Sequence, residues 1–463
     1  MIPRTRPVLT AMVILVFCGV FSGCGPGTKD SGSAIRLTVW ENYNNEEHKV
    51  FLEVVDDFVT RKRKQGVALQ IEVGRVPFDG LLPKLKAACL TNTTPDICRI
   101  DCAHVVPLAY GNAIVALDRE ENLSSSDLDR LRGEYVTAAI DSCLFRIRRK
   151  GEPKASRHLY GLPDQTNCLV LFYNPRLFEA RAKELRSAHL DPAKAPATWD
   201  EFVRYGRVLT FRRPDGQWQY AVGLNNTLWW SLPFFNTHGA RFMEQNQETG
   251  SFRCVLDDPL TIQAFSFKAN LSLQKYPLEG GESAIEARAW APAAVTPDQG
   301  FQNGIYAMVL SGPWNLKTFR EAKVPFKLAL IPRGPKGTSS TVGGTDLVVF
   351  RSCKHPKLAS EFLRFVTSEA VQTLWCSRLG QIPVRPSLFT NASLTQGREE
   401  LKVFFEQLLT TQARPPVPNY DKIEELAGAE MALALQGVKT PEGALKDAAE
   451  RINREIVPGL TEP

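Results

Sequence analysis

Hydrophobic and polar residues recur with regular periods along most of the chain, and these periods predict an α/β protein. Apolar and polar residues alternate over residues 35–40, as they do in a β-strand with one buried face. Apolar positions at helical spacing then predict a helix over residues 50–59. Strands over residues 68–73 and 96–100 and a helix over residues 81–90 complete this first part of the chain. The resulting β-α-β-α-β order is typical of a doubly wound α/β domain with a largely parallel sheet.

The same patterns continue toward the C-terminus. They predict strands over residues 168–173, 305–310, 326–331 and 347–350, and helices that begin after Thr198, near Pro356 and near Thr440. Thr198 and Glu201 have the spacing of a capping box, in which the threonine side chain accepts from the glutamate N–H and the glutamate side chain accepts from the threonine N–H. A predicted loop covers residues 277–300.

Residues 119–158 are highly charged and show no clear period, so we predict a surface elaboration there. It contains a cluster of basic residues: Arg146, Arg148, Arg149 and Lys150. This cluster is either a contact for a partner or a solvated face, which is the more common meaning of such a run.

The first 33 residues do not belong to the predicted fold. Arg4 and Arg6 precede an apolar run over residues 8–21, which is shorter than the ~20 residues that span a bilayer. Its end, Phe-Ser-Gly-Cys at residues 21–24, resembles a bacterial lipobox and implies cleavage before Cys24 and acylation of that cysteine. We therefore predict a lipoprotein signal peptide over residues 1–23 and a flexible spacer over residues 24–33. An uncleaved membrane anchor is the alternative.

Composition and charge limit the classes of function. Lys and Arg number 56 against 50 Asp and Glu, and a net charge of +6 over 463 residues is too mild to indicate nucleic-acid binding. With 43% hydrophobic residues, the chain can form the cores of two or three domains. After the N-terminal run, the sequence has no segment of membrane-spanning length and apolarity. The mature protein is therefore expected to be exported and tethered by its lipid, in the periplasm or at the cell surface.

Eight cysteines follow Cys24: Cys89, Cys98, Cys102, Cys143, Cys168, Cys254, Cys353 and Cys376. Export would permit disulfides, and the alternative is that they are small buried side chains. We predict a few disulfides and several buried thiols. Cys98 and Cys102 are close in sequence, but no second Cys/His pair lies nearby, so we predict no metal site.

No catalytic motif stands out in the chain. It has no nucleotide-binding loop, zinc-protease motif or serine-hydrolase motif, and its six histidines are scattered. The acidic pairs 56–57 and 257–258 are adjacent residues, whereas glycosidase carboxylates face each other across the substrate. The sequence therefore favours a binding protein that needs no cofactor over an enzyme.

A series of short motifs occurs in an order that resembles a known family. The motifs are LTVWE (37–41), PDICRID (95–101), GNAIVALD (111–118), YGLPDQT (160–166), LFYNP (171–175), ATWDEF (197–202), GIYAMVLSGPW (304–314), LALIPRGP (328–335), VGGT (342–345), EFLRFVTSE (361–369) and IPVR (382–385). Together they are similar to the family 1 extracellular solute-binding proteins of ABC importers, the maltose-binding-protein type. The resemblance covers nearly all of the mature chain.

The resemblance implies two doubly wound α/β lobes joined by a hinge, a periplasmic-binding-protein-like fold of type II. The first lobe would comprise residues 34–165 and 341–395, and the second residues 166–340 and 396–463. A small polar solute, in this family most often a sugar or oligosaccharide, would bind in the cleft between the lobes and trigger hinged closure. The implied partners are a membrane ABC permease and the bilayer that holds acylated Cys24, with the receptor itself a monomer.

For a sugar site, aromatic rings and polar groups at strand ends are the candidates, because sugars present flat C–H faces and many hydroxyls. The resemblance places Trp314, in Ser-Gly-Pro-Trp, against a sugar ring. Of the neighbours Trp229 and Trp230, we expect one to pack and Trp230 to face the ligand. Three further candidates end predicted strands: Trp40, Glu41 and Asp101. The alternatives are a solvated loop acid for Glu41 and a helix cap for Asp101.

The expected chain crossings between the lobes supply further candidates. They are Gln165 and Thr166 at the first crossing and Gly344 and Thr345 at the second, beside Asp164, Gly343 and Asp346. The glycines permit close backbone approach, although a plain turn would explain them equally. Tyr420 would close one edge of the cleft or simply pack. Arg385 is expected to brace its lobe through a carboxylate.

Two other functions are compatible with the sequence. Scattered acids and aromatic residues would also suit a secreted carbohydrate-active hydrolase. A receptor-like interaction module that kept the fold without a small ligand is the second alternative.

Overall fold

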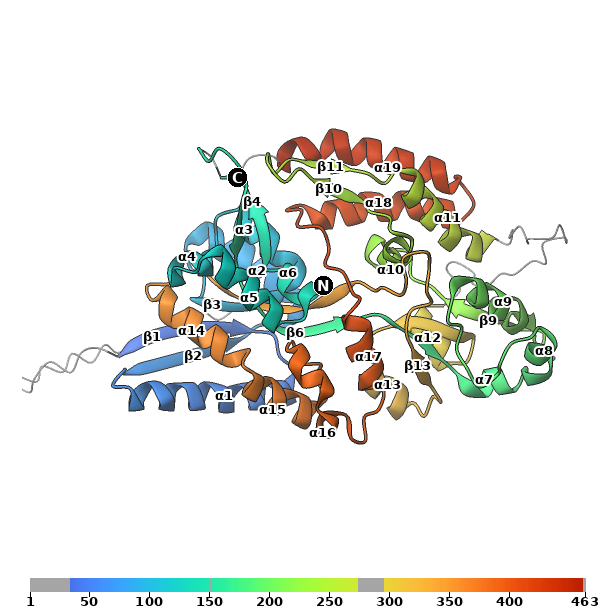
Figure 1. The fold of residues 1–463 in the computed structure, drawn as a ribbon, viewed down its shortest axis with the longest axis horizontal. Coiled ribbons are helices and arrows are strands. Elements are labelled where there is room, and N and C mark those ends of the chain that lie inside the picture. The colour runs from blue at the N-terminus through green and yellow to red at the C-terminus, as the bar shows by residue number, and fades with distance from the viewer. Residues whose placement is uncertain (1–33, 150, 274–294, 461–463) are drawn as a thin grey trace, which may run out of the picture.

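The computed structural model describes residues 34–149, 151–273 and 295–460. Ten of the described strands form two separate five-stranded sheets, each covered by helices, and the other four form two hairpins (Figure 1). We call each sheet with its helices a lobe. The predicted signal peptide, Cys24 and the spacer over residues 24–33 lie outside the described residues, as does most of the predicted loop over 277–300. Within the described ranges, no helix is long and apolar enough to cross a membrane.

The first lobe holds a mixed sheet of order β2-β1-β3-β14-β6. Its strands are β1 (Ile35–Glu41), β2 (Leu69–Arg75), β3 (Ile97–Asp101), β6 (Leu162–Cys168) and β14 (Val342–Val349). β1 runs parallel to β2 and β3, while β14 lies antiparallel to both β3 and β6. A strand from late in the chain thus completes a sheet that the N-terminal third begins, which agrees with the two-lobe fold expected from sequence.

Helices cover both faces of this sheet. They are α1 (Asn45–Lys64), α2 (Phe78–Thr91), α3 (Val105–Tyr110), α4 (Leu117–Glu121), α14 (Pro356–Val366) and α15 (Glu369–Leu379). α1 begins at a capping box in which Asn44 and Glu47 bond each other's backbone, and it buries an apolar face that includes Phe51 and Phe58. α14 starts with Pro356 in its first turn, as its sequence predicts.

The second lobe holds a sheet of order β13-β7-β12-β9-β8. Its strands are β7 (Val170–Tyr173), β8 (Phe211–Arg212), β9 (Trp218–Gly223), β12 (Tyr306–Ser311) and β13 (Lys327–Ala329). Around it lie α7 (Pro175–Glu179), α8 (Ala182–Ser187), α9 (Trp199–Leu209), α10 (Leu228–His238), α11 (Pro259–Leu273), α12 (Pro297–Gln302), α13 (Asn315–Glu321), α18 (Tyr420–Leu435) and α19 (Pro441–Glu455), with a hairpin of β10 (Met243–Gln245) and β11 (Phe252–Cys254). Thr198 caps α9, although Glu201 reaches back to the N–H of Ala197, one residue earlier than expected.

Three chain segments connect the lobes. β6 stays paired in the first sheet as far as Cys168 and β7 begins at Val170, so the change of sheet takes place at Leu169. β14 enters the first sheet at Val342. The third segment, residues 412–416, which we call the strap, is joined to the second at its start, because Val342 N donates to Gln412 O (3.0 Å). α16 (Ala392–Thr395) and α17 (Leu401–Leu408) precede the strap, and α17 packs on β6 and β7.

The prediction of a surface elaboration over residues 119–158 is wrong. This segment forms α5 (Ser125–Glu134), α6 (Thr137–Asp141), β4 (Leu144–Ile147) and β5 (Ser156–Leu159). Tyr135, Ile140, Phe145 and Ile147 are buried in the core of the first lobe. The elements are too short for a hydrophobic period to emerge between their charged residues, which explains the error. Short 3₁₀ turns at Cys102–His104, Pro386–Thr390 and Val457–Leu460 complete the fold.

The cysteine prediction is also wrong in one part. All eight cysteines after Cys24 are free thiols, and all but the half-buried Cys89 are buried. Burial raises the pKa of the Cys254 and Cys353 thiols to about 12, because a thiolate would lose its hydration there. These side chains therefore serve as small apolar packing groups.

Candidate functional site

Three tryptophans from two distant segments meet in the second lobe. Trp229 and Trp230 lie in the first turn of α10, and Trp314 follows β12. The ring centroids are 5.1 Å apart for Trp229 and Trp230, 6.4 Å for Trp229 and Trp314, and 6.3 Å for Trp230 and Trp314. Trp314 is 44% exposed, and the other two are half-buried. We call these residues the tryptophan cluster; its open indole surface is of the kind that stacks on flat apolar ligand faces.

A tight turn holds Trp314 in place. Its ring folds back over Gly312, where a Cβ atom would lie only 2.0 Å from the indole Cζ3, so residue 312 must be glycine for this arrangement. Asn315 Nδ2 donates to Ser311 Oγ (2.8 Å), and Ser311 Oγ donates to Asp298 Oδ1 (3.1 Å). These bonds tie the turn to α12.

The start of α10 is anchored by charged groups. The backbone N–H of Trp229 donates to both carboxylate oxygens of Glu424 on α18, at 3.0 and 3.1 Å. Tyr420 donates its hydroxyl to the same carboxylate at 2.6 Å. A carboxylate at this helix N-terminus is favourable because the free N–H groups there carry partial positive charge.

A fully buried lysine supports the same turn. Lys268 Nζ donates to Asn225 O (2.7 Å) and to Ser231 Oγ (2.6 Å), on either side of the tryptophan pair. Burial lowers the pKa of the Lys268 ammonium to about 7, and the nearby Glu424 carboxylate opposes that shift. The loop and the helix are thus held together by a lysine whose charge is marginal at neutral pH.

The tryptophan cluster also touches the crossing between the lobes. Trp229 Nε1 lies 3.5 Å from the carbonyl oxygen of Val342, the first residue of β14. A Cβ atom added to Gly343 would lie 3.5 Å from Trp229 Cζ2 and 2.4 Å from Asn167 Oδ1. That Asn167 oxygen is buried and has no hydrogen-bond partner among the described residues. An unpaired acceptor therefore lies on the same side of β14 as the indole.

Several predicted candidates belong instead to a buried polar network in the first lobe. Asp164 accepts hydrogen bonds from Arg99 Nε (2.8 Å), from Tyr43 Oη (2.5 Å) and from Thr345 Oγ1 (2.9 Å). Arg99 also donates to Gln165. Thr345 and Gln165 are thus engaged in bracing the sheet, as is Asp164.

The candidates at the ends of β1 and β3 are likewise engaged away from the tryptophans. Glu41 is fully buried, with Oε1 2.7 Å from His48 Nδ1 and Oε2 accepting from Tyr43 N. Lys84 Nζ lies 4.1 Å above the ring of Trp40. Asp101 accepts from Ala103 N at 2.8 Å, the capping role that was its alternative. Among the described residues, no hydrogen bond or ring contact links these three to the tryptophan cluster.

The remaining candidates lie near the crossings. Thr166 is buried and its hydroxyl has no partner among the described residues. Gly344 has φ +134°, and a Cβ there would lie 2.2 Å from Gln165 O. Tyr420 is buried, with the Arg414 guanidinium 4.9 Å above its ring.

Arg385 and Asp346 are both structural. Arg385 braces its lobe as predicted, through Glu134 (3.0 Å) and the carbonyl oxygen of Thr367 (2.8 Å). Asp346 is buried and accepts from Ser142 Oγ at 2.9 Å. Burial raises the pKa of the Asp346 carboxyl to about 7.

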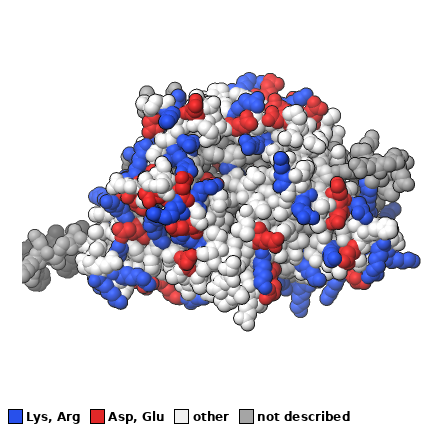
Figure 2. All heavy atoms as spheres, viewed as in Figure 1, with Lys and Arg blue, Asp and Glu red and all other residues white. Residues whose placement is uncertain are grey.

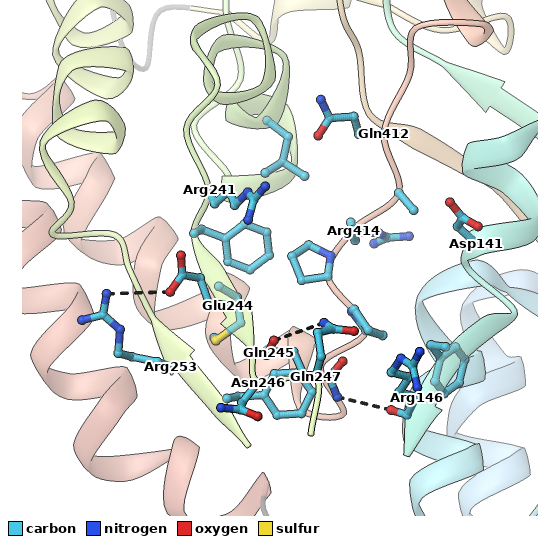
Figure 3. A pocket seen from close by; sticks show the side chains of 18 of the residues that line it. Asp141, Arg146, Arg241, Glu244, Gln245, Asn246, Gln247, Arg253, Gln412 and Arg414 are labelled. Atoms are coloured by element: carbon cyan, nitrogen blue, oxygen red, sulfur yellow. Dashed lines mark hydrogen bonds and ion pairs between the residues drawn. The ribbon is translucent and has the colours of Figure 1, made fainter. Parts of the chain in front are cut away.

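A cavity of about 1010 Å³ lies between the lobes (Figure 3), and none of the three tryptophans lines it. Its walls are α6 and the β4–β5 hairpin of the first lobe, the C-terminal half of α10 with β10 and β11 of the second, and the strap. Of the features predicted from sequence, only the basic cluster contributes to this cavity, through Arg146. The outer face in Figure 2 shows acidic and basic side chains interspersed over both lobes.

Sequence reasoning also missed Asn167, Lys268 and Glu424. Nothing in their local sequence distinguishes them from ordinary polar residues, because each gains its role from a contact with a distant segment. In the part of the chain that the structure describes, no three His, Cys, Asp or Glu side chains are grouped to hold a metal ion.

Comparisons with known proteins agree with this fold. The family model for bacterial extracellular solute-binding proteins matches residues 53–399. A galactooligosaccharide-binding protein of Bacillus subtilis is 22% identical over 96% of this chain and 96% of its own length. A maltooligosaccharide ABC transporter solute-binding lipoprotein of Streptococcus pneumoniae is 22% identical over 97% of this chain and 95% of its own.

Solved structures share the fold. A cyclo/maltodextrin-binding protein complexed with maltotetraose superimposes with a TM-score of 0.71 at 21% identity, covering 92% of this chain and 99% of its own. The cyclic alpha-maltosyl-1,6-maltose binding protein of Arthrobacter globiformis also gives 0.71, at 20% identity over 91% and 98% of the two chains. These similar proteins are binding proteins and not enzymes.

Proposed function

Because the chain belongs to the bacterial extracellular solute-binding proteins, we propose that it is the substrate receptor of an ABC importer and that it captures a sugar or oligosaccharide by closing its two lobes. It is a binding protein of that family, and the hydrolase alternative is therefore dropped. No observation favours the alternative of an interaction module without a ligand.

The observation that carries this proposal is the tryptophan cluster. Exposed indole surface binds the C–H faces of sugar rings, and edge-to-face packing keeps the rings in fixed directions. The Asn167 oxygen near Trp229 is unpaired and buried in this arrangement, and a lobe movement that exposes it would let it accept a bond from a sugar hydroxyl. Trp314, Trp230 and Trp229 are therefore proposed to contact ligand. Trp40, Glu41, Asp101, Gln165 and Thr345 are assigned to the support of the first lobe.

Closure is proposed to occur at the three connections described above. Leu169, Thr341 and Gln412 lie at these points, and only the last two are joined to each other by a backbone bridge. Each lobe has its own buried core, and a third apolar cluster that includes Ala139, Phe172 and Phe404 lies at the crossings. Rotation about a few residues there would move one core relative to the other. The sequence placed the first boundary between residues 165 and 166, whereas β6 stays paired in the first sheet as far as Cys168, so Leu169, Thr341 and Gln412 are proposed as the crossing points.

Export and anchoring are proposed from the N-terminal sequence. Acylation of Cys24 would hold the receptor, as a monomer, at the membrane beside its permease. The Streptococcus pneumoniae relative is itself named a lipoprotein. Mass spectrometry of the protein purified from membranes would test this: an N-terminal peptide that begins at acylated Cys24 is expected, and a free, uncleaved Met1 would contradict it.

Calorimetry with a panel of mono- and oligosaccharides, paired with small-angle scattering, tests the central proposal. At least one sugar is expected to bind and to reduce the radius of gyration. Absence of binding by every sugar would contradict a sugar site. Binding without compaction would contradict capture by closure.

A further inference from the structure

The interlobe cavity of about 1010 Å³ is unusually rich in arginine. Six arginines line it. Arg132, Arg146 and Arg157 belong to the first lobe, Arg241 and Arg253 to the second lobe, and Arg414 to the strap. Two lining residues, Asp141 and Glu244, are acidic. A guanidinium group that already binds a carboxylate has fewer N–H donors free for a ligand, so the pairing of each arginine decides what the cavity can bind.

Carboxylates neutralise three of these arginines. Arg132 donates to both oxygens of Asp141, at 2.6 and 2.7 Å. Arg157 donates to Asp129 at 2.5 Å. Arg414 lies 3.4 Å from Asp101. Arg253 has looser neighbours, 3.8 Å from Glu244 and 3.7 Å from Asp258.

Arg146 and Arg241 are not paired with a carboxylate. Among the described residues, neither has a carboxylate within 4.0 Å, although Arg146 Nη1 bonds the carbonyl oxygen of Ala155 at 3.3 Å. Arg146 comes from β4, and Arg241 comes from the segment between α10 and β10, so the two guanidinium groups belong to opposite walls (Figure 3). Arg146 is half-buried and Arg241 is exposed, so both guanidinium groups can be reached by a ligand in the cavity and neither is paired with an acid of the described chain.

We propose that this cavity is a second binding site, for a small anion with at least two negative charges carried on carboxylate or phosphate groups, held between Arg146 and Arg241. Arginine binds both groups through paired N–H donors, and such charge-assisted bonds are stronger than those to neutral groups. The side-chain amide of Gln412, which also lines the cavity, can donate to one of the remaining oxygens. A neutral sugar would offer these guanidinium groups only uncharged acceptors, which bind them more weakly.

An anion bound there would also affect lobe movement. The lobes already touch at the edge of the cavity, where Gln245 Nε2 donates to Arg146 O (3.2 Å) and Ala155 N donates to Glu248 O (3.0 Å). An anion that bridges both walls binds most tightly to this arrangement of the lobes. It must therefore shift the equilibrium toward this arrangement.

Titration calorimetry with inorganic pyrophosphate and with trigalacturonate tests the site, and the two probes distinguish phosphate from carboxylate. We expect saturable binding of at least one probe, with affinity about tenfold lower in Arg146→Gln and in Arg241→Gln. Arg61→Gln is the matched control: it removes the same charge from an exposed arginine of α1 that is paired with Asp57. Its affinity should equal that of the unmodified protein.

Trp314→Ala separates this site from the proposed sugar site, and it should bind the anion normally. Four results would overturn the proposal: no binding of either probe at millimolar concentration, an equal loss in Arg61→Gln, full affinity in both cavity variants, or loss of anion binding in Trp314→Ala. Failure of sugar binding leaves this test intact. Circular dichroism of each variant verifies that it is folded.

Discussion

The indole rings of Trp230 and Trp314 stand at 89° to each other with 6.3 Å between their centroids. Trp230 belongs to α10 and Trp314 to the turn after β12, so folding alone brings them together. The edge-to-face contact restrains both rings while Trp314 keeps 44% of its surface exposed. The proposed sugar site is therefore rigid before a ligand arrives.

Replacing Trp314 by alanine should weaken sugar binding by about 30-fold or more, since a tryptophan at the centre of a binding site commonly contributes about 2 kcal/mol. Calorimetry with the best sugar of the panel measures this. Trp218→Ala is the matched control, because Trp218 is 43% exposed and stacks on Tyr220 but lies on β9, outside the tryptophan cluster. Equal losses in the two variants would contradict the assignment.

Removing the charge of Glu424 should loosen the start of α10. In Glu424→Gln we expect the free energy of unfolding to fall by about 1 kcal/mol, because a charged acceptor at a helix N-terminus is lost. Sugar affinity should fall as well, since Trp229 is bonded to this carboxylate. Glu425→Gln removes the same charge from the exposed neighbour and should change neither quantity. Urea unfolding measures the stability and calorimetry measures the sugar affinity. If Glu424→Gln changes neither quantity, Glu424 does not anchor α10.

Lys268 should make stability rise with pH above neutrality. Its pKa is about 7 in the folded protein and 10.5 as the ordinary value, so between these values the unfolded chain binds more protons and folding gains stability as pH increases. The full difference is on the order of 4–5 kcal/mol. Urea unfolding of Lys268→Met at pH 7 and pH 10 should lack this rise. If both proteins follow parallel curves, the ammonium is not destabilised by burial.

Asp346 should make the stability of the protein fall as pH rises toward neutrality. Its folded pKa of about 7 exceeds the ordinary 3.8, so the folded protein binds the extra proton, and the resulting stability is lost as pH rises from about 4 to 7. Asp346→Asn keeps the shape of the protonated acid without its titration. The stability of the variant should therefore depend less on pH over this interval. An unchanged slope between pH 4 and 7 would show that Asp346 titrates normally.

The sequence predicted local elements correctly, but it did not predict which candidate residues are buried away from the site. The strand at Ile35–Glu41 and the cap at Thr198 follow from neighbours in sequence, and the structure confirms both. β14 begins earlier than its apolar residues indicate, because Gly343 and Gly344 pair with β6 although they have no hydrophobic side chain. Of the candidate binding residues, the motif around Trp314 led to the cluster. Glu41, in contrast, proved to be fully buried.

The sequence alone determined the α/β class, the presence of two lobes and the likeness to a solute-binding family, because alternating and helical periods and ordered motifs are local properties that survive in the linear chain. The tertiary structure decided which tryptophans meet, that all eight cysteines stay free, and that residues 119–158 wall a basic cavity. These features depend on distances between residues far apart in sequence. Only the packing of the two sheets and the three crossing segments sets such distances.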